Sequence, residues 1–198
     1  MGSRTAGATA TCCRGGSSWT PVAAIVDALD AAFYASFGNV TPTGKPWLLA
    51  LDVSGSMEGG QIAGVPGLTP RVASATMALI SAPLSISPCQ RLDDVLKTVS
   101  GLPFARTDCA LPMVWALKNK VETDVFVVYT DSETWVGNIQ SVQALRQYRE
   151  RMDIPAKLIV CGMVSNAFTI ANPDDVGTMD VVGFSTATPN VMSDFVVA

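Results

Sequence analysis

Four short runs of apolar residues constrain the fold more than any other feature of this sequence. They lie at Trp47–Leu51, Val125–Tyr129, Leu158–Met163 and Val181–Phe184. Each run is continuous rather than alternating, as expected of strands that are covered on both faces. Helix-like stretches separate them, at Arg71–Ile80, Arg91–Leu102, Ala110–Lys120, Val142–Met152 and Asn190–Val197. This alternation predicts an α/β fold, with a Rossmann-like, doubly wound, mostly parallel sheet that is flanked by helices.

The interval between Ile80 and Arg91 interrupts this alternation. It contains two prolines and leaves no room for a buried strand, so two helices follow each other where a strand is expected. Leu84–Ile86 is at most a short remnant of an edge strand. We therefore predict that the sheet lacks a strand here and that the domain has a small margin of stability, because the neighbouring strand would expose unpaired backbone groups.

The N-terminal segment has a different composition. Residues 1–18 are rich in Gly, Ala, Ser and Thr and contain no acidic residue, which predicts a disordered extension. Thr20 and Pro21 are typical of a helix start, and Gly38 of a helix end, so a helix is predicted over residues 21–37. We expect its apolar face to pack on the core of a domain that spans residues 19–198.

Composition excludes several classes of function. The 198 residues contain no histidine, which removes Ser-His-Asp and Cys-His nucleophiles, and there is no C-x-x-C pair to suggest zinc. No apolar run approaches the roughly 20 residues of a membrane span, and the N-terminus lacks a signal region, so we expect a cytoplasmic protein with no membrane partner. The net charge of −4 argues against a broadly basic surface for nucleic acid.

Polar residues follow the first apolar run directly. Asp52, Ser54 and Ser56 form an Asp-x-Ser-x-Ser turn at the end of the expected strand. A turn of this kind can direct three side-chain oxygens at one divalent cation, and ligands gather at the carboxyl ends of strands in open α/β sheets. The alternative is a turn in which the same side chains only accept hydrogen bonds from backbone N–H groups.

Two further segments are expected at the same edge of the sheet. Thr107 follows a loop that is rich in Gly and Pro, and Asp131 ends the strand at Val125–Thr130. Together with the Asp-x-Ser-x-Ser turn they form an oxygen-only set suited to Mg²⁺ or Mn²⁺, with a coordination position open for a carboxylate or phosphate. Asp108 could orient a ligand or cap the following helix, and Glu133 could hydrogen-bond to metal-bound water or lie exposed in its loop.

These residues resemble the metal-ion-dependent adhesion site (MIDAS) of von Willebrand factor A domains. That site combines Asp-x-Ser-x-Ser, a loop Thr and a loop Asp, which Asp52, Ser54, Ser56, Thr107 and Asp131 match in order. Several stretches also resemble the von Willebrand half of the Ro autoantigen (SS-A/Ro, TROVE) ribonucleoproteins, especially the bacterial ones. They are Ile25–Phe37, Thr107–Ala116, Thr130–Thr134 and Met152–Met163.

The resemblance implies membership of a family that takes part in RNA quality control. Ro proteins bind noncoding Y RNAs mainly through a ring of helical repeats, which this sequence does not contain, so we expect any RNA contact of the chain alone to be weak. The family also has a strand and a hairpin between the helices that contain Met77 and Leu92, and the interval here is too short for them. The resemblance further implies a protein or RNA partner that offers an acidic group to the metal.

Three interpretations of function follow. The leading one is a non-enzymatic, Mg²⁺-dependent binding module of a Ro-like ribonucleoprotein. The second is a phosphohydrolase of the haloacid dehalogenase type, but that class needs Asp-x-Asp, and Ser54 stands where the second carboxylate would act as the general acid. The third is a fragmentary gene product with no autonomous function.

Overall fold

The structure, a computed structural model, consists of two compact units, which are treated separately. Unit 1 covers Met1–Val40 and unit 2 covers Thr41–Ala198. The described residues are 10–11, 18–62, 65, 67–81, 94–96, 107–131, 137–164 and 170–198.

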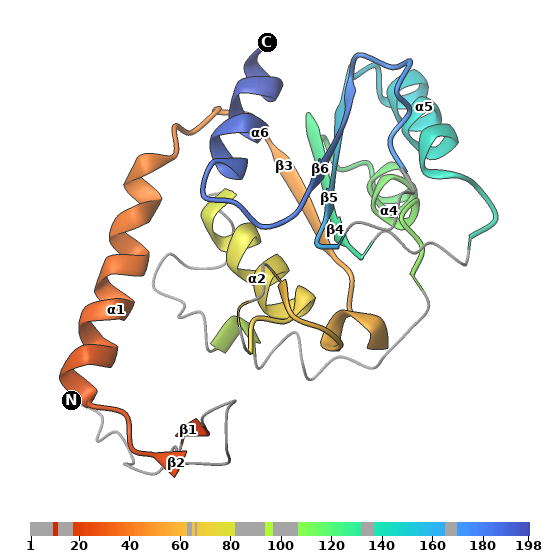
Figure 1. Ribbon diagram of the computed structural model, residues 1–198. Helices are drawn as coiled ribbons and strands as arrows, with labels where there is room; N and C mark the ends of the chain where they lie inside the picture. The colour runs from red at the N-terminus through yellow and green to blue at the C-terminus, as the bar shows by residue number, and fades with distance from the viewer. Residues whose placement is uncertain are drawn as a thin grey trace. The chain divides into compact units, whose positions relative to one another are not determined.

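Unit 2 is built on a parallel four-stranded sheet (Figure 1). Its strands are β3 (Trp47–Leu51), β4 (Val125–Thr130), β5 (Lys157–Gly162) and β6 (Thr178–Val182), in the spatial order β3-β4-β5-β6. All three neighbouring pairs are parallel. The α/β fold expected from the apolar runs is therefore confirmed, and the first three strands lie where these runs predict them.

The fourth strand lies earlier in the chain than the sequence predicts. The apolar run suggested Val181–Phe184, whereas β6 pairs with β5 from Thr178 to Val182. β6 is at one edge of the sheet, and none of its residues is fully buried. An edge strand of this kind includes polar residues, so a search for continuous apolar sequence displaces its bounds.

Helices cover both faces of the sheet (Figure 1). On one face lie α2 (Pro70–Ser81) and α6 (Thr188–Val197), and on the other lie α4 (Leu111–Asn119) and α5 (Ser141–Met152). Side chains of β4 alternate between the two layers: Val127 and Tyr129 pack with α2 and α6, while Phe126 and Val128 pack with α4 and α5. A strand that feeds two cores must be apolar at every position, which explains the continuous runs.

Four of the predicted helices are confirmed to within two residues at each end. Of the fifth, predicted at Arg91–Leu102, the structure describes residues 94–96, which are helical. Lys120 follows the last residue of α4 and Asp153 follows that of α5, and both have left-handed backbone (φ 53° and 56°). Such a residue ends a helix because it redirects the chain while the last carbonyls keep a hydrogen-bond partner.

The predicted loss of a strand falls in the interval between Ile80 and Arg91. Residues 82–93, including Leu84–Ile86, lie outside the described residues. Among the strands that the structure describes, β3 pairs with β4 alone. The expected absence of a strand beside β3 stays a prediction.

Unit 1 contains one long helix and a short antiparallel pair. β1 (Ala10–Thr11) pairs with β2 (Ser18–Trp19), and α1 spans Ala23–Ala35 before a 3₁₀ turn at Ser36–Asn39. The helix predicted over residues 21–37 was too long at both ends. Val22 rather than Thr20 precedes the first helical residue, and from Ser36 the chain continues as the 3₁₀ turn. The sequence did not predict the β1–β2 pair, whose residues, apart from Trp19, fall within the expected extension. Packing of α1 on the core stays a prediction.

Candidate metal centre

Asp52 lies at the carboxyl end of β3 and is fixed to the neighbouring strand. Its backbone N–H donates to the carbonyl of Tyr129 at 2.9 Å, so the β3–β4 ladder continues one residue past the end of β3. This contact sets the height of the Asp52 side chain at the edge of the sheet. Asp131 follows β4 as Asp52 follows β3, and only 5% of it is exposed.

The Asp52 carboxylate joins three segments of the chain. Its Oδ1 accepts a hydrogen bond from the backbone N–H of Ser54 at 2.8 Å. Its Oδ2 accepts from the hydroxyls of Thr107, at 2.9 Å, and Thr130, at 3.0 Å. The turn hydrogen bond of the alternative interpretation is thus present, but it uses only one carboxylate oxygen. The other oxygen brings together the loop before α4 and the end of β4.

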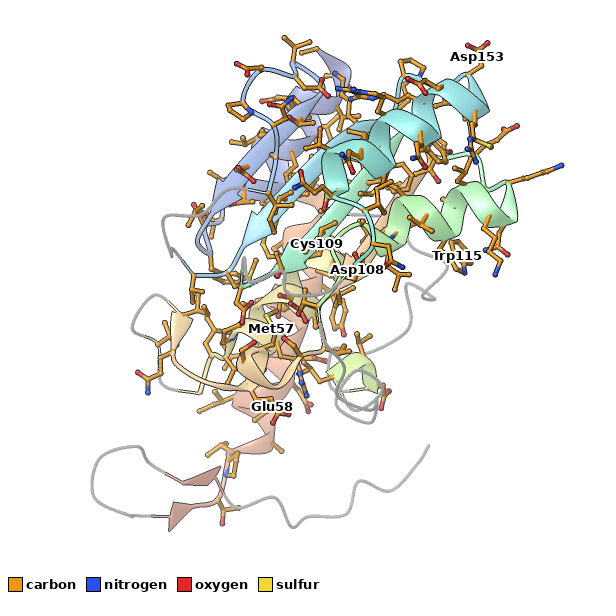
Figure 2. All side chains as sticks on the ribbon, turned by 90° about the vertical axis from the view of Figure 1, so that its right-hand side faces the viewer. Met57, Glu58, Asp108, Cys109, Trp115 and Asp153 are labelled. Carbon is orange, nitrogen blue, oxygen red and sulfur yellow. The ribbon has the colours of Figure 1, made fainter. Side chains whose placement is uncertain are left out.

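The two serines of the turn form a pair of neighbouring hydroxyls. Ser54 Oγ and Ser56 Oγ are 3.0 Å apart, with Ser54 buried and Ser56 exposed. Ser56 belongs to a 3₁₀ turn, Gly55–Glu58, which is anchored in the core by the fully buried Met57 (Figure 2). Burial of Met57 therefore holds both hydroxyls at the end of the sheet.

Asp108 makes the hydrogen bond expected of a residue at a helix start. Its Oδ1 accepts from the N–H of Ala110 at 2.9 Å, in the turn that leads into α4. Gly137 lies against this carboxylate, because a Cβ built there would be 2.9 Å from Asp108 Oδ1, and its φ is +141°. The residue that precedes α4 is Ala110, and no side chain caps it, so the Asp108 hydrogen bond closes the turn before the helix. A role of Asp108 in orienting a metal ligand stays a prediction. Glu133 lies outside the described residues.

Sequence reasoning missed two residues that shape this site. Thr130, which is fully buried, was assigned only to a strand, although its place beside Asp52 follows from the register of two parallel strands. Arg71, in the first turn of α2, is 3% exposed. It donates to the carbonyls of Val53 and Ser54, each at 3.2 Å, and pairs with Glu58 at 2.5 Å. In the sequence, Arg71 stands only at the start of a predicted helix, and this position does not indicate that it contacts the turn after β3.

A cavity of about 360 Å³ opens beside Asp52 and Thr107. Its walls are mainly apolar and come from β3, β4 and α4; they include Leu48, Leu111 and Trp115. Trp115 is 51% exposed and lies on α4, one to two turns beyond Asp108 (Figure 2). The polar edge of the sheet thus continues into an apolar wall.

The two cysteines that the structure describes, Cys109 and Cys161, are buried thiols. Burial raises the pKa of the Cys161 thiol to about 12, and the charge of Asp180 adds to this shift. A thiol with this pKa stays protonated near neutral pH and is a poor metal ligand. In the part of the chain that is described, no cluster of three or more His, Cys, Asp or Glu side chains is arranged for a metal ion. Among the described residues, the oxygens near Asp52 include hydroxyls as well as carboxylates.

Comparison with known proteins gives the family. The model of the Ro60 vWA (von Willebrand factor A) domain matches residues 80–196, which is more than half of the chain. The chain therefore belongs to the Ro60 vWA domain family, as its parallel sheet and the Asp-x-Ser-x-Ser turn suggested.

Individual relatives agree with this assignment. The chain is 45% identical to the RNA-binding protein RO60 of Deinococcus radiodurans and 40% identical to that of Caenorhabditis elegans, in each case over 92% of its length. The crystal structure of the Deinococcus radiodurans RO (RSR) protein superimposes with a TM-score of 0.79 over 94% of this chain, at 44% identity. The chain spans only 37% and 31% of the two RO60 sequences and 41% of the crystallised chain.

The helices give no indication of a membrane span. None in the described part of the chain is both long and apolar enough to cross a bilayer.

Proposed function

We propose that this chain is a Mg²⁺-dependent, non-enzymatic ligand-binding domain of a Ro-type RNA-binding protein. The observation that carries the proposal is the convergence of Thr107 and Thr130 on one oxygen of Asp52, with Ser54 and Ser56 beside it. Oxygen ligands of this kind suit Mg²⁺ or Mn²⁺.

The spacing of these oxygens supports the proposal. Neighbouring ligands of an octahedral Mg²⁺ ion, at bonds of about 2.1 Å, are roughly 3 Å from each other. Ser54 Oγ and Ser56 Oγ are 3.0 Å apart, and Thr107 Oγ1 and Asp52 Oδ2 are 2.9 Å apart. The residues that would hold the ion are Asp52, Ser54, Ser56, Thr107 and Asp131. A bound ion would supply a positive charge with an open position for an acidic group of a partner.

We expect the partner of this domain to be found in an RNA-binding protein complex, as the relatives indicate. Both RO60 relatives carry RNA binding in their names, which is why we place this domain in a protein of noncoding RNA binding and RNA quality control. The chain covers about a third of those proteins and has a net charge of −4. We therefore expect most RNA affinity to come from parts of such proteins that this chain does not contain, and the metal site to hold an acidic group of a protein or RNA.

A metal titration tests the proposal. Calorimetry with Mn²⁺ should show binding to the full chain and none to the Asp52→Asn variant, which keeps the shape of the side chain but loses its charge. Asp180→Asn is the matched control, because Asp180 lies on the edge strand β6 and should not affect the ion. Equal Mn²⁺ affinity of the wild type and Asp52→Asn would refute the metal site. Turnover of a generic phosphate ester that Asp52→Asn abolishes would instead favour the phosphohydrolase interpretation.

A gel-shift titration tests the RNA component. The chain alone should bind a structured noncoding RNA weakly, and the affinity should fall with salt because few phosphates are neutralised. Nanomolar binding that does not respond to salt would contradict this expectation.

A further inference from the structure

Arg71 occupies a place where a cation is unfavourable. It lies in the first turn of α2 (Pro70–Ser81), and its side chain is 4% exposed. The N-terminus of a helix carries a partial positive charge, which repels a cation, and burial of a guanidinium costs further free energy unless its N–H groups find acceptors. Other interactions must compensate for both effects.

Three described acceptors of Arg71 come from the turn that carries the candidate ligands. Nη2 donates to the carbonyls of Val53 and Ser54, and Nη1 pairs with the Glu58 carboxylate. Val53 lies between Asp52 and Ser54 in the sequence, and Glu58 is two residues after Ser56. We name Arg71, Val53, Ser54 and Glu58 the Arg71 network. The network holds the turn at both ends of the Asp-x-Ser-x-Ser segment.

We propose that Arg71 is a positioning residue for the divalent ion, acting through this backbone rather than by contact with the ion. The inference rests on the proposed function of the site. The carbonyl of Val53 belongs to the same peptide group as the N–H of Ser54, and that N–H donates to Asp52 Oδ1. By fixing this peptide, Arg71 orients the Asp52 carboxylate and the Ser54 hydroxyl together.

Two effects of Arg71 on the ion have opposite signs. Its positive charge repels a metal ion, whereas its hydrogen bonds preorganise the ligands. Glu58 pairs with the guanidinium and offsets the charge. Orientation should therefore dominate, and loss of residues that orient metal ligands typically weakens metal affinity by about 10 to 100-fold. If charge alone mattered, removal of Arg71 would strengthen metal binding. The direction of the change in metal affinity therefore distinguishes the two effects.

The experiment is Mn²⁺ calorimetry on the full chain, with the Mn²⁺ electron paramagnetic resonance spectrum as a second readout. Arg71→Met should weaken binding by about tenfold or more. Arg71→Lys should also bind weakly, because a single ammonium cannot reproduce the fork that bonds two carbonyls and a carboxylate. Glu58→Gln should cause a smaller loss; Glu58 is half exposed, so this variant tests the network even if Arg71→Met fails to fold.

Arg149→Met is the matched control. Arg149, on α5, donates to the carbonyls of Ala156 and Gly177 and pairs with Asp175, so its loss removes a similar set of contacts away from the metal site. Its thermal midpoint should fall while its Mn²⁺ affinity and resonance spectrum stay those of the wild type.

Different outcomes overturn different claims. No Mn²⁺ binding by the wild type refutes the proposed function. Wild-type binding with unchanged or tighter binding by Arg71→Met and Glu58→Gln refutes the role of Arg71 alone. Full affinity in Arg71→Lys would show that the forked hydrogen bonds of the guanidinium are not needed. Equal weakening by Arg149→Met would show that general stability, rather than positioning, explains the effect.

Discussion

Two buried or half-buried arginines make nearly the same contacts at opposite ends of the sheet. Arg71 bonds two carbonyls and a carboxylate in the turn that follows β3. Arg149 bonds the carbonyls of Ala156 and Gly177, which directly precede β5 and β6, and pairs with Asp175 at 2.6 Å. We call this second set the Arg149 network. Figure 2 shows the two ends, with Glu58 near the first and Asp153, which ends α5, at the other.

The difference between the networks lies in their electrostatic setting. Arg149 is in the last turn of its helix, where the helix dipole favours a cation, and its side chain remains 25% exposed. Arg71 is in the first turn of its helix and is 4% exposed. Fold stability accounts for the position of Arg149. It accounts less well for Arg71, which suggests that the turn it holds has a function.

Within the Arg149 network, the largest effect on stability should come from Arg149→Met. The variant loses hydrogen bonds from a charged donor that is partly shielded from water, so we expect a loss of about 2 kcal/mol in the free energy of unfolding. Urea denaturation, followed by circular dichroism, measures it. A loss below a few tenths of a kcal/mol would mean that the Arg149 network is only a surface contact.

Gly177→Ala should weaken the same network from its other side. A Cβ at Gly177 would overlap the Arg149 guanidinium, so the arginine must move away from the Gly177 carbonyl. We expect a loss of about 1 kcal/mol, because the guanidinium is the flexible end of a long side chain. Gly59→Ala, beside the candidate metal site, is the control, since its Cβ would make only an ordinary contact with the Ser56 carbonyl at 3.5 Å.

The double variant sharpens this comparison. If Gly177→Ala acts through Arg149, its cost should nearly vanish in the Arg149→Met background, as expected for residues in one network. Additive losses would show instead that the alanine strains the backbone before β6.

The smallest effect should be a dependence on acid. Burial raises the pKa of Asp175, but the hydrogen bonds from Arg149 and the Gly177 N–H, with the charges of Arg149 and Arg146, bring it below its usual 3.8. Because the pKa is lower in the folded state, the contribution is fully present above the unfolded value of 3.8 and is lost as the pH falls through the folded value. Stability measured from pH 6 to pH 2 should thus decline less steeply in Asp175→Asn. Parallel pH profiles would contradict a lowered pKa.

The sequence was most informative about strands that are buried on both faces. β3, β4 and β5 lie where continuous apolar residues predicted them, because each contributes side chains to two cores. The predicted bounds of β6 were too late in the chain, because an edge strand can include polar residues such as Thr178 and Asp180. The start of α1 was placed too early, because a Thr-Pro pair signals a helix start without fixing its first residue.

The sequence predicted those residues of the candidate site that lie close together in the chain or match the family motif. Asp52, Ser54 and Ser56 are close in the chain, and Thr107 contacts Asp52 as the family resemblance suggested. Thr130 was missed because its contact with Asp52 depends on the register of two strands. Arg71 was missed because its side chain contacts carbonyls of residues 17 and 18 positions earlier in the chain. The contacts of Arg149 could not be predicted either, because the sequence does not show that its two carbonyl partners lie directly before two other strands.

The hydrogen bonds of Asp52 also determine when the site can exist during folding. They join residues that are 55 and 78 positions apart, and the second bond requires β3 and β4 to be in register. Contacts across such separations form slowly, because a long loop must close before they contribute free energy. The candidate ligands are therefore brought together only after the centre of the sheet has formed. A metal ion at Asp52 would thus act on the finished domain, slowing its unfolding rather than speeding its folding.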